Sequence, residues 1–183
     1  MQKIYLCIFT LLLFSCQEQP NKNVYIPPAS IDSFQNKFNL NLGADELKKI
    51  IKKIDFLIID ESLDSQIKFQ KIDEVSPNEI SDLIDCGTMN NEVYVDYINR
   101  IFDSSLKIKT TIEIKSIDKS NSILKLISYY VFTSIETGTQ WRFKTNESKM
   151  ILVGTPAYGA EPYRECASKH LFESRIIKEF INQ

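Results

Sequence analysis

The alternation of residues 106–115 constrains the fold more than any other feature of this 183-residue chain. One phase holds Leu106, Ile108, Thr110, Ile112 and Ile114, and the other phase is mostly charged. Because successive side chains of a β-strand point to opposite faces, this pattern predicts a strand with one buried face and one wet face. Sheets of that kind are typically antiparallel.

Three more segments with strand character follow along the chain. Residues 123–135 are apolar on both phases, which is typical of a strand at the centre of a sheet or covered on both sides. Trp141 and Phe143 alternate with polar residues, and residues 150–153 follow another turn. With residues 106–115, these segments predict a four-stranded antiparallel meander.

The segments before the meander predict a helix and a hairpin. Leu47, Ile50, Ile51 and Ile54 are spaced as one face of a helix that starts near Asp45. The other face carries Lys48, Lys49, Lys52 and Lys53, which are either solvated or in contact with lipid phosphates. Residues 56–59 and 66–72 predict a hairpin, whereas residues 92–102 are ambiguous and favour irregular structure with a helical turn.

A second amphipathic helix is expected at the end of the chain. It starts at Ser168 as N-cap or at Pro162 and runs towards Ile181. Its apolar stripe is formed by Phe172, Ile176, Ile177 and Phe180. The predicted fold class is therefore α+β: an antiparallel sheet, made of a meander of about four strands plus an N-terminal hairpin, packs against the C-terminal helix and one N-terminal helix.

Residues 1–15 have the pattern of a secretion signal. Lys3 precedes an apolar run from Ile4 to Phe14, which is too short to span a hydrocarbon core of about 30 Å. The run ends in Leu13-Phe14-Ser15-Cys16, which resembles the lipobox of bacterial lipoproteins. The resemblance implies cleavage before Cys16 and diacylglycerol on its sulfur, with several acyl chains holding the protein on a membrane. An ordinary signal peptide cleaved nearby is the alternative.

The residues after Cys16 predict where the mature protein resides and how it is divided. In lipoproteins of enterobacteria an Asp directly after the lipidated cysteine favours the inner membrane, and Gln17 stands here instead. The resemblance thus implies a cell-envelope location at the outer membrane, on its periplasmic face or at the cell surface. Residues 16–41 hold three prolines and five asparagines and are expected to form a tether, although Phe34 and Phe38 are apolar enough to pack. Residues 42–183 are expected to form one globular domain.

Two of the four cysteines are left for the folded domain. Cys7 leaves with the signal and Cys16 is lipidated, so Cys86 and Cys166 are expected to form a disulfide in an oxidising compartment. The alternative pairs Cys166 with His170, four residues on, as nucleophile and base or as two metal ligands. His170 is the only histidine, and a metal site needs further ligands. No metal and no cofactor are therefore expected.

Two places in the last third of the chain are candidates for polar contacts or binding. Glu173 falls inside the apolar arc of the last helix, where a buried acid needs a partner. Arg142, or the hydroxyl of Tyr129 or Tyr130, is the expected partner, and a functional carboxylate is the alternative.

The loop 154–165 holds Tyr158, Tyr163 and Arg164 among glycines and prolines, a composition typical of recognition surfaces. These three residues, with Arg142, are the candidate binding residues. The alternative is a covering loop whose tyrosines pack on the sheet.

A second resemblance covers the folded part. The outline of helix, hairpin, meander and helix, with Asp85-Cys86-Gly87, Trp141-x-Phe143 and Cys166 before the last helix, is similar to small bacterial lipoproteins of an uncharacterised family. It is also similar to the helix-grip lipoprotein of the outer-membrane barrel assembly machine. The resemblance implies a helix-grip-like α+β domain.

The sequence favours a non-catalytic role. It has no phosphate-binding glycine loop and no Gly-x-Ser-x-Gly motif, so we expect no enzyme. Without residues 1–15 the chain has 21 basic and 24 acidic residues, so no nucleic-acid partner is expected. The first hypothesis is an envelope lipoprotein that binds a protein or glycan partner. The second is an immunity-type lipoprotein that neutralises a toxin outside the cytoplasm, which predicts an acidic exposed patch.

Overall fold

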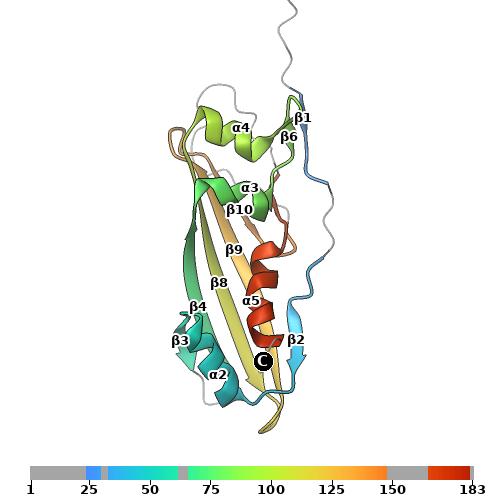
Figure 1. Cartoon of the computed structure of the whole chain (residues 1–183), viewed down its shortest axis with the longest axis vertical. Helices are drawn as coiled ribbons and strands as arrows, with labels where there is room; N and C mark the ends of the chain where they lie inside the picture. Colours follow the sequence, from blue (N-terminus) through green and yellow to red (C-terminus); the bar gives the residue numbers. More distant parts are fainter. Residues whose placement is uncertain (1–23, 30–32, 62–65, 148–164, 182–183) are drawn as a thin grey trace, which may run out of the picture.

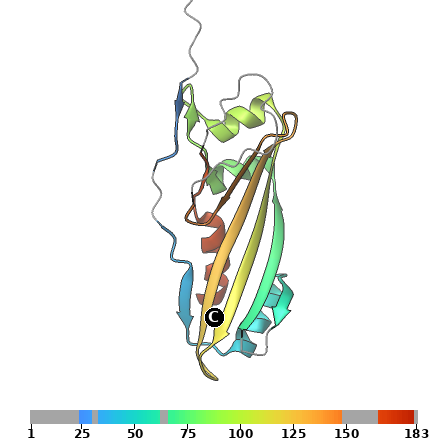
Figure 2. The same ribbon diagram turned by 180° about the vertical axis from the view of Figure 1, so that it is seen from behind.

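The structure is a computed structural model, and it describes residues 24–29, 33–61, 66–147 and 165–181. The elements in chain order are β1 (Tyr25–Ile26), β2 (Lys37–Leu40), α2 (Ala44–Lys53), β3 (Leu57–Glu61), β4 (Gln66–Val75), η1 (Pro77–Glu79), α3 (Ile80–Leu83), β5 (Ile84–Asp85), β6 (Thr88–Met89), β7 (Glu92–Val93), α4 (Tyr94–Ile101), β8 (Ser104–Ser116), β9 (Ser122–Ser134), β10 (Gln140–Lys144), β11 (Ala167–Ser168) and α5 (Leu171–Ile181). A long twisted sheet carries α5 against one face, as Figures 1 and 2 show from opposite sides. The predicted α+β class with an antiparallel sheet is confirmed.

The large sheet is built around two long strands. Its order is β10-β9-β8-β4-β3, and β2 also pairs with β9. Strands β8 and β9 have 13 residues each and pair along their whole length. Asp118 closes the turn between them, because its carboxylate accepts the N–H groups of Ser120 at 2.7 Å and Asn121 at 2.8 Å. Three strands of the predicted meander are thus confirmed, and the fourth, at residues 150–153, lies outside the described residues.

The position of β9 in the sheet explains why its sequence is apolar on both phases. It has β8 on one edge and both β10 and β2 on the other. Only one of its faces is buried: Leu126 and Tyr130 are inaccessible, whereas Ile127 and Val131 on the other face are half-buried. Of the two explanations offered by the sequence, a central strand is therefore right and a strand covered on both faces is wrong.

The covered face of the sheet holds two apolar clusters. The first packs α3, α4 and the disulfide against the sheet and includes Tyr94 and Trp141. The second packs α2 and the end of α5 against the other half of the sheet and includes Leu47 and Phe180. Between the two clusters the strands contribute the buried cross-strand neighbours Thr110 and Ser128. A polar band therefore crosses the interior of the protein.

The predicted N-terminal helix and hairpin are present. Leu47, Ile50 and Ile51 of α2 are buried, and the carboxylate of Glu46 accepts the N–H of Gly43 at 3.2 Å, which caps the helix start. Strands β3 and β4 pair antiparallel as expected, and β4 continues to Val75 along β8. The order β4 then β8 joins the hairpin to the meander in one sheet.

Helix α5 begins later than the sequence suggested. Ser168 is not its N-cap, because it lies in β11, opposite Ile84 of β5. The helix begins at Leu171, after a left-handed turn at His170 with φ of 61°. The hydroxyl oxygen of Ser168 accepts the N–H of His170 at 2.9 Å and so closes this turn. The other proposed start, Pro162, lies outside the described residues.

Residues 94–101 form the regular helix α4, so the expectation of irregular structure with a single helical turn was wrong there. Tyr94, Val95 and Ile98 are buried in the first apolar cluster. Aromatic and β-branched residues have modest helix propensity, so packing stabilises this helix more than local preference does. That is why the sequence pattern alone was ambiguous.

The segment expected to be a tether is partly folded. Strand β1 pairs with β6, and β2 pairs with β9. Phe34 and Phe38 pack against the second cluster, as their apolar character suggested. Described residues before residue 42, at 24–29 and 33–41, are therefore packed against the rest of the folded body. Such short strands form because they pair with the edge of another strand, and the local sequence pattern does not show which edge that is. Among the described helices, none is both long and apolar enough to cross a bilayer.

Candidate functional site

The disulfide forms the first candidate site, a junction of chain segments distant in sequence. Strands β5 and β11 pair antiparallel, so that Asp85 lies opposite Ala167 and the adjoining Cys86 and Cys166 are brought together. Their sulfur atoms are bonded at 2.06 Å and both residues are fully buried. The predicted disulfide is confirmed, and the alternative of Cys166 acting with His170 is excluded because its sulfur is bonded to Cys86.

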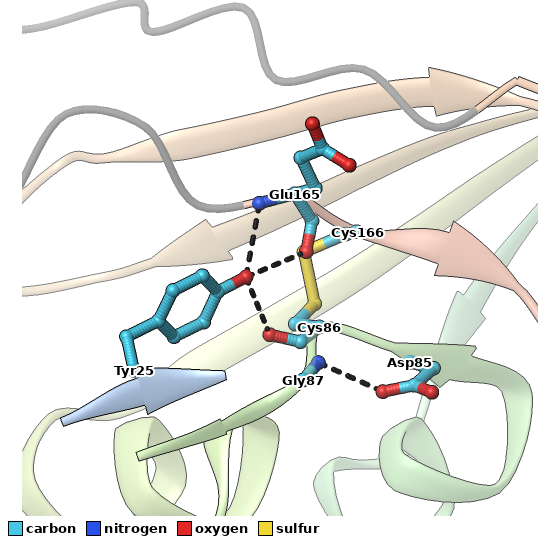
Figure 3. Close-up of a disulfide and its surroundings, with 6 residues drawn as sticks. All are labelled: Tyr25, Asp85, Cys86, Gly87, Glu165 and Cys166. Carbon is cyan, nitrogen blue, oxygen red and sulfur yellow. Dashed lines mark hydrogen bonds between the residues drawn. A yellow bond between two sulfur atoms is a disulfide. The ribbon is translucent and has the colours of Figure 1, made fainter. Parts of the chain in front are cut away.

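Tyr25 of β1 ties the N-terminal strand to this junction, as Figure 3 shows. Its hydroxyl lies 3.1 Å from the carbonyl oxygen of Cys86 and 3.3 Å from that of Glu165, and it accepts the N–H of Glu165 at 3.1 Å. Its ring packs edge-on against Tyr94, with 5.8 Å between the centroids. One side chain therefore contacts both segments that the disulfide joins.

Gly87 lets β1 approach this closely. Its φ of 76° is in the left-handed region, and a Cβ added there would lie 2.1 Å from the carbonyl oxygen of Ile26. The N–H of Gly87 donates to the Asp85 carboxylate at 2.8 Å, which closes the turn between β5 and β6. The Asp85-Cys86-Gly87 motif thus combines a turn, a disulfide and a docking place for β1.

The second candidate site is the buried carboxylate of Glu173, in the first turn of α5. Glu173 is fully buried within the polar band of the interior. The Thr145 hydroxyl donates to Oε1 at 2.8 Å, and the Ser168 hydroxyl lies 3.2 Å from Oε2. The first turn of a helix also favours a negative charge through the helix dipole. The expected buried acid is therefore present, with hydroxyl partners.

Of the three partners expected for Glu173, only Tyr130 lies on the correct face of the sheet. Its hydroxyl is 2.9 Å from Ser168 Oγ, which in turn contacts Glu173. Burial is the main cause that raises the pKa of Tyr130 above its ordinary value, and the negative charge of Glu173 is the second. The phenol therefore stays neutral. Arg142 and Tyr129 lie on the opposite face, because they alternate with buried neighbours. Their predicted contact with Glu173 was wrong, and the phase set by Trp141 and Phe143 already excluded Arg142.

The remaining predicted site residues are distributed as follows. The Arg142 guanidinium binds the side-chain oxygen of Gln140 at 2.6 and 3.2 Å on the uncovered face of the sheet. The His170 ring packs on Phe34, with centroids 5.5 Å apart. Cys16, Tyr158, Tyr163 and Arg164 lie outside the described residues. In the described ranges no three His, Cys, Asp or Glu residues are grouped so as to hold a metal ion.

Two shallow pockets lie beside the β3–β4 edge and share Lys71. One, of about 200 Å³, lies between β4 and α5 and is lined by Ile54, Phe56, Lys71, Asp73, Phe172, Arg175, Ile176 and Glu179. The other, of about 310 Å³, lies on the strand side near Leu57, Ile59 and Ile72. Small-molecule sites usually enclose about 300–1,000 Å³ and bury most of their ligand. The first pocket is smaller than that range and the second lies at its lower end, and both are open to solvent, so neither is assigned a small-molecule ligand.

Comparisons of the chain with protein-family models, with curated proteins and with solved structures find no match.

Proposed function

We propose that this protein is a lipoprotein of the bacterial cell envelope, anchored through lipid on Cys16, whose folded domain has a non-catalytic binding or structural role. The Leu13-Phe14-Ser15-Cys16 lipobox motivates the anchor. The observation that carries the proposal is the attachment of β1 to the disulfide junction through Tyr25. That attachment lies nine residues after the proposed lipid site, at a covalently cross-linked part of the domain.

The attachment suits a chain that is held at its N-terminal end. A force on the anchor would act first on β1, whose neighbours are cross-linked by Cys86 and Cys166. Because β1 alone has only two residues, the Tyr25 contacts and the apolar packing of its ring add to its backbone pairing. The junction therefore transmits a force on the proposed anchor to the cross-linked part of the domain.

The non-catalytic role is supported by the surroundings of the reactive side chains. The sulfur atoms of Cys86 and Cys166 are in a disulfide, and Glu173 is enclosed away from solvent. His170 lies against Phe34 rather than beside a nucleophile. We therefore expect the domain to bind an envelope protein or glycan, or to serve a structural role, at the outer membrane.

Intact-mass measurement of the membrane-extracted protein tests the anchor. The wild-type chain should carry the mass of diacylglycerol and acyl chains, and Cys16→Ala should abolish the added mass and make the membrane association sensitive to a high-salt wash. Cys7→Ala is the matched control, because Cys7 lies in the segment that would be removed. An unlipidated wild-type protein, or a loss of lipid in the Cys7→Ala variant, would overturn the proposal. Separation of the two membranes on a density gradient tests the outer-membrane location.

The immunity-type alternative ranks second. It requires an acidic exposed patch that mimics or blocks the partner of a toxin. The sheet face opposite α5 carries more basic than acidic residues, so it does not supply such a patch. No observation therefore favours the immunity role over the envelope role.

A further inference from the structure

The face of the large sheet opposite α5 is uncovered by any described helix, as Figure 2 shows. Burial alternates along each strand, and the pairing register aligns the less buried residues of neighbouring strands on this face. Its basic residues are Lys37, Lys68, Lys107, Lys109, Lys115, Lys125, Arg142 and Lys144. Its acidic residues are Asp60, Glu74 and Glu113. The chain as a whole has a formal net charge of −2, so the fold concentrates positive charge on this face.

Some of this charge is neutralised within the face and some is not. Glu113 lies 3.7 Å from the Lys68 ammonium and 3.5 Å from that of Lys125, and Glu74 lies 2.8 Å from that of Lys107. Lys109 and Lys115 form no ion pair with another described residue. They are exposed on β8, in the middle of the sheet. Lys144 also pairs with Glu147, just beyond β10, at 3.5 Å, and the face keeps an excess of positive charge after all these ion pairs are counted.

An apolar stripe runs between the basic residues. On β9, the outward residues include Ile123, Ile127, Tyr129 and Val131. Tyr129 is 37% exposed and lies directly across from Lys109 on β8 and Lys144 on β10. The Lys144 ammonium lies 5.7 Å from the centroid of the Tyr129 ring. Apolar and aromatic residues flanked by lysines are the pattern of surfaces that lie at the boundary of an anionic membrane.

We propose that this uncovered face binds the anionic headgroups of the bilayer that carries the anchor. The choice of a membrane as occupant rests on the proposed lipidation of Cys16. Val24 is eight positions after Cys16, a reach of at most about 28 Å, which is shorter than the span of about 43 Å of a 13-residue strand such as β8. The tether therefore keeps the long sheet close to the bilayer surface at a high effective concentration.

The charge and the shape of this face suit that occupant. A long sheet that lies along the bilayer brings many lysines to the headgroups at once, while Tyr129 and the isoleucines reach the interfacial region. Each basic residue near an anionic surface strengthens binding by about fivefold. The lysines on the outer face of α2, which the sequence also suggested for lipid contact, lie on another part of the molecule (Figure 1).

Vesicle binding of the chain from Gln17 onward tests this inference, since that chain contains every described element but neither the leader nor the lipid. It should sediment with phosphatidylcholine vesicles that contain phosphatidylglycerol and not with vesicles of phosphatidylcholine alone. Added salt should weaken the binding. A variant with Lys107→Gln, Lys109→Gln and Lys115→Gln should bind about a hundredfold more weakly.

The matched control removes three exposed lysines from α2, with Lys49→Gln, Lys52→Gln and Lys53→Gln. It has the same net charge as the β8 variant and should bind within a few-fold of the unmodified chain. Equal losses in the two variants, binding to neutral vesicles, or binding to dextran sulfate without binding to anionic vesicles would each overturn the inference. Because no lipid is attached in this experiment, a failure of the face is separate from a failure of lipidation, which the intact mass reports.

Discussion

The Thr145 hydroxyl donates a 2.8 Å hydrogen bond to the carboxylate of Glu173, and this bond joins the sheet to the start of α5 inside the protein. Thr145 also accepts the N–H of Ser128 at 2.8 Å, so one hydroxyl links two strands and a helix. The buried polar band between the two apolar clusters is therefore continuous from β8 through Thr110 and Ser128 to α5.

Thr145→Val should destabilise the fold by about 2–4 kcal/mol, because it removes the shorter hydrogen bond to the buried Glu173 carboxylate, which keeps the longer one to Ser168, and leaves the Ser128 N–H without its partner. Urea unfolding followed by circular dichroism measures the change. Thr111→Val is the control, since Thr111 lies half-buried on the uncovered face of β8 and should change stability by less than about 0.5 kcal/mol. Equal effects of the two substitutions would contradict the role assigned to Thr145.

Replacing both Cys86 and Cys166 by serine should lower stability by about 2–5 kcal/mol, because the disulfide closes a long loop in the unfolded chain. Reduction of the wild-type protein should lower the urea midpoint to a similar extent. The double variant should show no further change when a reductant is added. A reductant effect that persists in the double variant would show that another pair of cysteines is involved.

Gly87→Ala should destabilise the protein more than Gly138→Ala does. Both glycines have a positive φ, which costs an alanine about 1 kcal/mol or more. A Cβ at Gly87 would also meet the backbone of Ile26 and Pro27, whereas a Cβ at Gly138 would meet nothing within 4 Å. The difference in unfolding free energy therefore measures the docking of β1, and proteolysis near Tyr25 should accelerate only in the Gly87→Ala variant.

Stability should fall as the pH rises above about 10 in a manner that depends on Tyr130. Burial and the Glu173 charge raise the pKa of Tyr130 in the folded state, so above that pH the unfolded chain loses a proton that the folded protein keeps. The contribution is fully present below the ordinary tyrosine pKa and declines by about 1.4 kcal/mol per pH unit above it. Tyr130→Phe should flatten this part of the pH profile, measured by urea unfolding at several alkaline pH values. An unchanged slope would contradict the assignment.

The sequence predicted the elements whose pattern repeats over many residues. The alternation of β8, the apolar positions of α2 and α5, and the hairpin of β3 and β4 were all recognisable, because each period reports one backbone geometry. The pairing of Cys86 with Cys166 followed from their number. The short strands β1, β5, β6 and β11 were missed, because two residues carry no period.

For Glu173, the sequence predicted the burial of the side chain but not its hydrogen-bond partners. Its position within an apolar helix face predicted burial, and its burial required hydrogen-bond donors. Thr145 and Ser168 were not foreseen, because isolated threonines and serines are common at the ends of strands and in turns. They became partners only when β10, β11 and α5 were packed together.

By itself, the sequence determined the class of fold and the identity of the disulfide, since these depend on periodicity and a count of cysteines, and it alone carries the resemblance to a lipobox. Only the tertiary structure decided that β1 is held at the disulfide junction, that a polar band divides the core, and that one sheet face collects the basic residues. These features depend on which distant segments lie side by side. The composition of the chain, in which basic and acidic residues are nearly balanced, does not predict that arrangement.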